Sequence, residues 1–260
     1  KVSRRFTMKQ RMQAGKPVFG TFLKSYCPQI AEIIGYSGMD FVVIDCEHSN
    51  YSYSEMEDMV RACEISDMAS IVRPPSCTPW HIHHALETGA TGVQIPSISS
   101  VQDAVDAAVE TAFYPEGTRS PNPSLRAAYF GFWNGEKNFL DTAKESSLCV
   151  MHVEDIAMVP HVEELCEIPQ IDVLFVGPGD LSMSMGKPGK LNDPEVAAVI
   201  ENIIHRGIKG GKMMGMLCNT PEAVKKYVDM GVTYILYSSD VGIIGKELRS
   251  LNKNIFDLYR

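Results

Sequence analysis

Glycines and a carboxylate follow a short apolar run beyond the middle of the chain. Residues 173–176 (Val-Leu-Phe-Val) are typical of a strand buried on both faces, and Gly177-Pro178-Gly179-Asp180 follows directly. Glycine amides can approach an anion closely, and a carboxylate such as Asp180 can bind a cation. The pattern therefore indicates a site for a metal ion and an acidic substrate. The alternative is an ordinary strand-to-helix turn in which Asp180 caps the helix.

Three other apolar runs also end in side chains that can do chemistry. These are Asp45, Glu47 and His48 after the second predicted strand, Arg73 at the end of the third, and His152 and Glu154 at the end of the fifth. Charged side chains are rarely buried without a partner or a function. Their position at the ends of buried strands therefore predicts that they share one site.

Glu154 and Asp180 could bind one divalent cation together. Two carboxylates, with water and substrate at the remaining positions, suit Mg²⁺ or Mn²⁺. His152 precedes Glu154 by two residues, so both point to the same face of the strand. A nitrogen ligand from His152 would favour Mn²⁺, Co²⁺ or Zn²⁺. The alternatives are that both carboxylates cap helices and that His152 is a hydrogen-bonded core residue or a substrate contact.

Arg73 and His48 could supply the charge and the proton transfer of a reaction. The guanidinium of Arg73 could hold an oxygen on which negative charge develops, or could form a structural salt bridge with Asp45 or Glu47. The imidazole of His48 has the pKa range of a general acid–base, and Asp45, three residues earlier, is near enough to orient it.

Other reactive residues form weaker patterns. His81, His83 and His84 open a predicted helix, but no carboxylate or cysteine at matching spacing completes a zinc site. The seven cysteines are odd in number and include no Cys-x-x-Cys pair, which is typical of reduced thiols in a cytoplasmic protein. Cys46 lies near His48, but nothing else marks it as a nucleophile.

Composition limits the classes of partner. The chain has 260 residues, 45% of them hydrophobic, and a net charge of −8, which argues against a nucleic acid or an anionic membrane surface as partner. No apolar run approaches the roughly 20 residues that span a bilayer. The basic start at residues 1–16 is not followed by the apolar region of a secretory signal. We expect one domain over residues 1–260 that is located in the cytoplasm and binds small molecules.

The elements that must position these residues alternate along the chain. The predicted strands are residues 18–23, 41–45, 69–73, 92–96, 148–154, 173–176, 213–217 and 234–238. The predicted helices are residues 28–36, 54–66, 79–88, 100–113, 156–166, 194–209, 221–230 and 242–251. The second of these begins with Ser54 and Glu57 in a capping-box pattern. Eight strands alternating with eight helices predict an α/β fold, a (β/α)8 TIM barrel.

Two features of this alternation bear on the fold. An open doubly wound sheet is the competing architecture, but no Gly-x-Gly-x-x-Gly follows the first strand. Residues 114–147 interrupt the alternation and are too long for a structureless loop, so we expect short helices or a subunit contact there.

Several of these motifs together resemble one known family. Asp45-x-Glu47-His48, Arg73-Pro74, Glu154 and Gly177-Pro178-Gly179-Asp180-Leu181-Ser182-x-x-Met185-Gly186 occur in the order and at the intervals of the class II, metal-dependent pyruvate aldolases of the HpcH/HpaI family. The likeness runs from about residue 19 to 245. It implies a barrel of the phosphoenolpyruvate/pyruvate type whose last helix is exchanged between subunits. It also implies a homo-oligomer, a hexamer built as a trimer of dimers.

The resemblance implies a role for each site residue. Glu154 and Asp180 match the metal ligands, and Arg73 matches the arginine that stabilises an enolate. His48 matches the acid–base histidine that Asp45 supports, with Glu47 as a further support. The groups around the substrate are matched by His152, Gly177, Pro178, Gly179 and Asp180, and the amides of Gly179 and Asp180 bind its carboxylate. Glu87 matches an acidic residue that reaches the histidine across a subunit contact. The implied reaction splits a 4-hydroxy-2-oxo acid into pyruvate and an aldehyde through an enolate.

Three departures from the family pattern affect substrate and metal preference. His152 stands where the family usually has Gln, Glu87 where it has Asp, and Ser120 follows Arg119 where the family has Arg-Gly. Two other functions therefore stay open. One is a related citramalyl-CoA or malyl-CoA lyase, although no basic patch near the strand ends suits a CoA phosphate. The other is a non-catalytic protein that binds 2-oxo acids.

Overall fold

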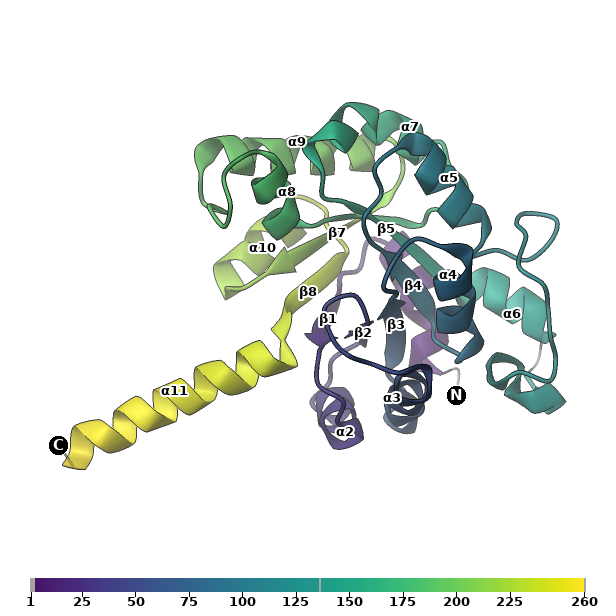
Figure 1. The fold of residues 1–260 in the computed structure, drawn as a ribbon, viewed down its shortest axis with the longest axis horizontal. Coiled ribbons are helices and arrows are strands. Elements are labelled where there is room, and N and C mark those ends of the chain that lie inside the picture. The colour runs from purple at the N-terminus through teal and green to yellow at the C-terminus, as the bar shows by residue number, and fades with distance from the viewer. Residues whose placement is uncertain (1–2, 136, 260) are drawn as a thin grey trace.

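A closed barrel of eight parallel strands forms the centre of the molecule. The computed structural model describes residues 3–135 and 137–259. In this part of the chain each strand pairs with the next, and β1 pairs with β8 (Figure 1). The strands are β1 (Val18–Leu23), β2 (Phe41–Asp45), β3 (Ala69–Arg73), β4 (Gly92–Ile95), β5 (Leu148–Val153), β6 (Val173–Val176), β7 (Met213–Cys218) and β8 (Tyr234–Ser239). The predicted TIM barrel is confirmed.

Helices surround the barrel. Those that connect successive strands or follow the last one are α2 (Pro28–Tyr36), α3 (Tyr53–Ile65), α4 (Pro79–Glu87), α5 (Val101–Val109), η3 (Ile156–His161), α7 (Val162–Cys166), α8 (Pro178–Ser184), α9 (Pro194–Lys209), α10 (Pro221–Asp229) and α11 (Asp240–Tyr259). The interruption at residues 114–147 contains the short helices η2 (Arg126–Gly131) and α6 (Phe139–Ser146), as expected. Two further helices, η1 (Arg4–Thr7) and α1 (Met8–Gln13), precede the first strand and were not predicted.

One predicted helix start is wrong. The sequence suggested a capping box from Ser54 to Glu57, but α3 is capped two residues earlier. The backbone amide of Glu55 donates to the side chain of Ser52, and the Glu55 side chain accepts from the Ser52 backbone. Both pairs have the same spacing, and the pair nearer to the end of the preceding loop forms the cap.

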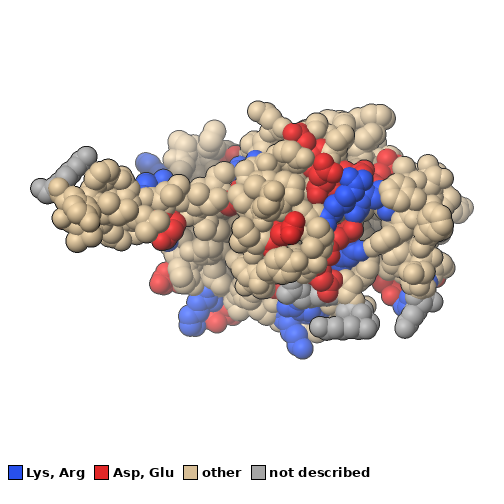
Figure 2. All heavy atoms as spheres, turned by 90° about the horizontal axis from the view of Figure 1, so that it is seen from below, with Lys and Arg blue, Asp and Glu red and all other residues tan. Residues whose placement is uncertain are grey.

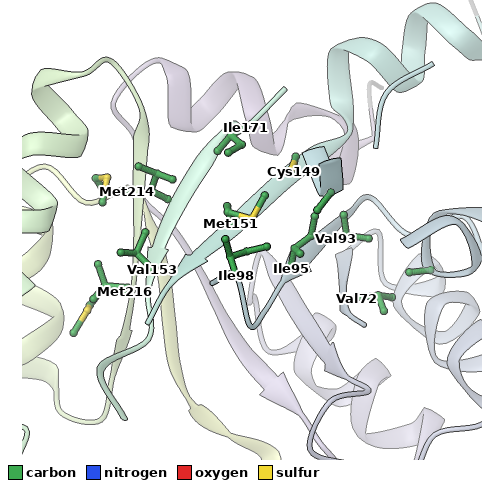
Figure 3. Packing of buried hydrophobic residues seen from close by; sticks show 14 of the residues in the cluster. Val72, Val93, Ile95, Ile98, Cys149, Met151, Val153, Ile171, Met214 and Met216 are labelled. Atoms are coloured by element: carbon green, nitrogen blue, oxygen red, sulfur yellow. The ribbon is translucent and has the colours of Figure 1, made fainter. Parts of the chain in front are cut away.

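The hydrophobic core has two parts. Inside the barrel, Met8 and Met12 of α1 pack with Val18 and Phe41, the first residues of β1 and β2. Helix α1 therefore closes the amino-terminal end of the barrel. Outside the barrel, strand residues that face away from its axis pack under the surrounding helices, as Figure 3 shows for Val93, Met151 and their neighbours. At the opposite end of the barrel the carboxyl ends of the strands line an open pocket.

Helix α11 extends well away from the barrel (Figure 1). It covers Asp240–Tyr259, longer at both ends than the predicted residues 242–251. Many of its apolar side chains are exposed, among them Ile244, Leu248, Leu251 and Ile255. In Figure 2 the projecting part carries few charged side chains on the visible face. None of the described helices is long and apolar enough to cross a membrane.

Candidate active site

The carboxyl ends of the strands enclose a pocket of about 250 Å³. Of the residues singled out in the sequence, His48, Arg73, His152, Glu154, Gly177, Pro178, Gly179 and Asp180 line it. They come from the ends of β2, β3, β5 and β6, so the structure brings these strand ends together around one pocket. The remaining lining residues are Phe22, Lys24, Phe175, Leu217, Asn219, Ser238 and Ser239.

Arg73 is held rigidly by two carboxylates. Its Nε and Nη2 donate to Oδ1 and Oδ2 of Asp45 at 2.8 and 2.7 Å, and its Nη1 lies 3.1 Å from Oε2 of Glu47. Burial alone would raise the pKa of Asp45, but hydrogen bonds and charge from Arg73 and Lys24 outweigh it and lower this pKa to about 2. The salt bridges considered as an alternative role thus exist. They also fix a guanidinium at the pocket wall, where it can face a substrate oxygen.

His48 is positioned differently from the expectation. Its imidazole is half exposed, and Nε2 lies 3.7 Å from Oε2 of Glu47. Asp45 accepts a hydrogen bond from the backbone amide of His48 at 3.2 Å, and its carboxylate otherwise binds Arg73 and Lys24. The expected support of the imidazole by Asp45 is therefore indirect, because the buried carboxylate is used by the two cations. The carboxylate nearest to the imidazole is Glu47.

His152 belongs to a buried chain of hydrogen bonds. The hydroxyl of Tyr234 donates to Oε1 of Gln94 at 2.8 Å, and Nε2 of Gln94 lies 2.8 Å from Nε2 of His152. An amide nitrogen can only donate, so Nε2 of His152 accepts and the ring proton is on Nδ1, which contacts Oε2 of Glu154. With both ring nitrogens engaged and 2% of the residue exposed, His152 matches the core-histidine alternative better than a metal ligand.

Glu154 is held by two neighbours. Its Oε1 accepts from the backbone amide of Ser97 at 2.8 Å, and its Oε2 contacts His152. Burial alone would raise the pKa of Glu154, but His152, Ser97 and Arg73 lower it to about 2. A Cβ at Gly177 would come within 2.8 Å of Oε2 of Glu154, so only glycine leaves room for this carboxylate. Glu154 is not a helix cap, because Asp155 caps η3 instead.

Asp180 lies in the first turn of α8 and is exposed to the pocket. The N-cap of this helix is Gly177 and has no side-chain cap bond, so the alternative of a capping Asp180 is wrong. The first hydrogen bond of the helix runs from the amide of Leu181 to the oxygen of Gly177 at 3.0 Å. The amides of Gly179 and Asp180 precede this bond, so no carbonyl of the helix accepts from them and they can bind an anion. A Cβ at Gly179 would meet open space.

Glu154 and Asp180 meet the requirements of a shared cation site in part. Both are carboxylates on adjacent strand ends, and Glu154 is ionised and held in place. Among the described residues, no group of three or more His, Cys, Asp or Glu is placed to hold a metal ion. A cation between the two carboxylates would therefore complete its coordination with substrate and water, which is typical of Mg²⁺ and Mn²⁺.

The other candidates lie outside the pocket. Glu87 ends α4, its charge acts on Arg119, and it does not line the pocket that contains His48. Burial raises the pKa of Cys46 to about 12, which agrees with an unreactive thiol. His81, His83 and His84 have separate partners, Ser76, Glu110 and the backbone of Trp80.

Several pocket or support residues were missed in the sequence. Lys24, Asn219 and Ser238 stand at the ends of β1, β7 and β8, where the same strand-end argument would have found them. Gln94 could have been noticed as the only strongly polar side chain inside the short apolar strand β4. Its link to His152 and Tyr234 depends on contacts across the barrel, which no local pattern shows.

Known proteins resemble this chain in sequence and in fold. The HpcH/HpaI aldolase/citrate lyase family matches residues 18–246. The chain belongs to this family. It is 30% identical over 245 residues to a hydroxypyruvate/pyruvate aldolase from Agrobacterium fabrum, covering 94% of this chain and 91% of the relative. It is also 30% identical over 232 residues to a 2-dehydro-3,6-dideoxy-6-sulfogluconate aldolase from Pseudomonas putida, covering 89% and 90%.

Solved structures agree with this membership. An HpcH/HpaI aldolase/citrate lyase family protein from Burkholderia cenocepacia superimposes with a TM-score of 0.89 at 28% identity, over 96% of this chain and 98% of that one. The citrate synthase SbnG superimposes with a TM-score of 0.87 at 26% identity, over 97% and 98%. The family member described here is therefore an aldolase or a related lyase.

Proposed function

We propose that the chain is a metal-dependent class II aldolase that splits 4-hydroxy-2-oxo acids into pyruvate and an aldehyde, and that also catalyses the reverse addition. The supporting observation is the pocket itself. It joins Glu154 and Asp180, a guanidinium on Arg73, an imidazole on His48 and the free amides of a helix start. The alternative, that Glu154 and Asp180 cap helices, does not apply, because Asp155 and Gly177 occupy the two N-cap positions.

Each residue has a task that follows from its position. Glu154 and Asp180 would hold a divalent cation, which supplies Lewis-acid polarisation of a keto acid. The amides of Gly179 and Asp180 bind the substrate carboxylate. Arg73, fixed by Asp45 and Glu47, stabilises the negative charge that develops on the keto oxygen.

Proton transfer is assigned to His48. In cleavage, its imidazole accepts the proton of the C4 hydroxyl while the C3–C4 bond breaks. The electron pair of that bond forms the enolate of pyruvate, and C4 leaves as the carbonyl carbon of the aldehyde. A proton then adds to C3 and gives pyruvate. The exposure of His48 in the pocket lets the imidazole exchange its proton with water between turnovers.

Deuterium exchange into the methyl group of pyruvate tests this proposal. The protein is incubated in D₂O with pyruvate and Mg²⁺, Mn²⁺, Co²⁺ or excess EDTA, and exchange is followed by proton NMR. We expect exchange that requires a metal and is lost in Glu154→Gln and Asp180→Asn. A folded protein that shows no exchange with any of these ions would favour the non-catalytic binding protein.

We also propose that α11 packs against another copy of the chain in a homo-oligomer. The family resemblance implies that this oligomer is a hexamer. The exposed apolar side chains of the projecting helix support it. Light scattering should give the mass of a hexamer for the wild type and a smaller mass for Leu248→Glu/Leu251→Glu. Lys253→Glu, on the opposite face of the helix by its periodicity, is the matched control. A wild-type monomer would refute the proposal.

A further inference from the structure

Lys24 introduces a positive charge on the side of the pocket away from Glu154 and Asp180. It follows β1 directly, and its backbone amide donates to Oδ1 of Asp240 at 2.9 Å. The amide of Ser25 donates to Oδ2 of the same carboxylate at 3.0 Å. Asp240 is buried at the start of α11. The backbone that carries Lys24 is therefore fixed by the neighbouring strand end.

Lys24 is a second cation beside a carboxylate that Arg73 already pairs. Its Nζ lies 3.0 Å from Oδ2 of Asp45, but this carboxylate already receives both arms of the Arg73 guanidinium. The side chain of Lys24 is 30% exposed, and an ammonium has three donors, so it can donate to a second group in the pocket. Arg73 is more constrained, because its Nε and Nη2 bind Asp45 and its Nη1 binds Glu47, which leaves only the second hydrogens of Nη1 and Nη2 for a substrate oxygen.

Neutral polar groups surround this lysine. Asn219 follows β7, and Ser238 and Ser239 end β8, which pairs with β1. The Asn219 amide and the Ser238 hydroxyl have no hydrogen-bond partner within residues 3–135 and 137–259. None of the described pocket residues from β7, β8 or β1 is acidic. We call Lys24, Asn219, Ser238 and Ser239 the β7–β1 side of the pocket.

The strand register explains how Ser238 faces the pocket. Gly20 pairs with Leu236, but Phe22 pairs with Ser239, so β8 has one extra residue between these pairs. Ser238 lies in this bulge and has a φ of 56°, in the left-handed region. Bulges at barrel rims redirect side chains, and strained backbone occurs at functional sites.

We propose that the β7–β1 side binds an anionic group at the far end of the aldehyde portion of the substrate, with Lys24 as its cationic partner. The inference rests on the proposed function, which places the 2-oxo acid end at Glu154, Asp180 and Arg73. A substrate held there extends its remaining carbons toward the other side of the pocket. Lys24 then selects a carboxylate, sulfonate or phosphate over a neutral group of the same size.

The test is a preference measured within each variant. Pyruvate is added to succinic semialdehyde and to 4-methylpentanal, in which an isopropyl group replaces the carboxylate, and the ratio of the two kcat/KM values is determined. We expect the wild type to favour the anionic aldehyde at least about tenfold, because hydrogen bonds to charged groups are strong. Lys24→Met should remove most of this preference, and Lys24→Arg should keep it. General losses of activity cancel in the ratio.

Two further comparisons complete the experiment. Lys209→Met, which removes an exposed lysine from the last turn of α9, should leave the ratio unchanged. Glyceraldehyde 3-phosphate against glyceraldehyde gives the preference for a phosphate over a hydroxyl, and comparing this ratio with the ratio for succinic semialdehyde shows which anion the site favours. A wild type without preference, or a Lys24→Met variant that keeps the preference, overturns the inference.

A binding measurement separates this inference from the proposed function. Calorimetry compares 2-oxoglutarate with 5-methyl-2-oxohexanoate, which carries an isopropyl group in place of the distal carboxylate. A preference for 2-oxoglutarate that depends on Lys24, in a protein without deuterium exchange, would support the anion site and refute the aldolase. Exchange in the absence of any Lys24-dependent preference would refute the anion site alone.

Discussion

The two sides of the pocket are built in opposite ways. The β5–β6 side comprises His152, Glu154 and Asp180. The buried His152 has both ring nitrogens, and the partly buried Glu154 both carboxylate oxygens, in contact with fixed neighbours. On the β7–β1 side, the Ser238 hydroxyl and the Asn219 amide have no partner in the described chain. Fixed groups cost no reorganisation when charge develops in a reaction, whereas free polar groups can adapt to a ligand. The difference suggests that one side performs the chemistry and the other selects the substrate.

Between these two sides, the ends of β2 and β3 hold paired charges that are buried. Asp45 is completely buried, and its ionised form depends on Arg73 and Lys24. Removing one partner of such a group typically costs about 3–5 kcal/mol because a charge remains buried and unpaired. Substitutions at the ends of β2 and β3 should therefore change both catalysis and stability, and experiments must measure the two separately.

The largest effect is expected for Arg73→Ala. The substitution removes the guanidinium that we propose stabilises the keto oxygen, and loss of such a group lowers turnover by about 10³-fold. It also leaves Asp45 with Lys24 as its remaining cation. Turnover should be measured at a temperature at which near-ultraviolet circular dichroism shows a folded variant.

Arg73→Lys is the matched control. It keeps the charge but loses the two-armed bond to Asp45, so we expect a loss at least tenfold smaller than in Arg73→Ala. A folded Arg73→Ala protein that cleaves substrate at nearly the wild-type rate would show that Arg73 acts only as the salt-bridge partner of Asp45 and Glu47.

An intermediate effect is expected for Gln94→Leu. Leucine has a similar size but cannot bond to Tyr234 or His152, and each buried group left without a partner costs about 1–3 kcal/mol. His152 would then be free to change its tautomer and its contact with Glu154. Because such supporting contacts affect metal affinity by about 10–100-fold, calorimetry with Mn²⁺ should show weaker binding by that factor.

The same chemical change elsewhere provides the comparison. Gln102 is an exposed residue of α5 whose amide donates to Asp106 at 2.7 Å, and Gln102→Leu should leave Mn²⁺ affinity unchanged. If Gln94→Leu binds Mn²⁺ as tightly as the wild type, the hydrogen-bond chain does not position Glu154 for a metal.

The contrast between the two sides also explains how much could be predicted from the sequence. The barrel was predictable because each strand is a short apolar run with local end signals, and several helices begin at prolines such as Pro28 and Pro194. The residues at strand ends were predictable because parallel strands place their carboxyl ends together. Arg73, Glu154 and Asp180 follow from this rule.

Contacts between distant segments could not be predicted in the same way. Gln94 and Tyr234 come from strands on different parts of the barrel, and their hydrogen bond depends on the closed interior. Asp45 was expected to orient His48, its neighbour in sequence, but it binds Arg73 on the adjacent strand. Local spacing cannot show which of two partners a buried carboxylate takes, because that choice depends on which cation can reach it without water.

The smallest effect is expected at Ser238, on the β7–β1 side. Its left-handed backbone costs a non-glycine residue about 1–2 kcal/mol of stability. Glycine would relieve this strain, but it also raises the conformational entropy of the unfolded chain, which offsets part of the stabilisation. Ser238→Gly should therefore raise the free energy of unfolding by up to about 1 kcal/mol, whereas Ser238→Ala, which keeps the strain, should not. Thermal unfolding measures this difference.

The same two variants test the role of the Ser238 hydroxyl. Both variants lack it, so both should weaken the binding of an anionic aldehyde and raise its KM by a similar small factor. If only Ser238→Gly did so, the backbone of the bulge, and not its hydroxyl, would be what shapes this side of the pocket.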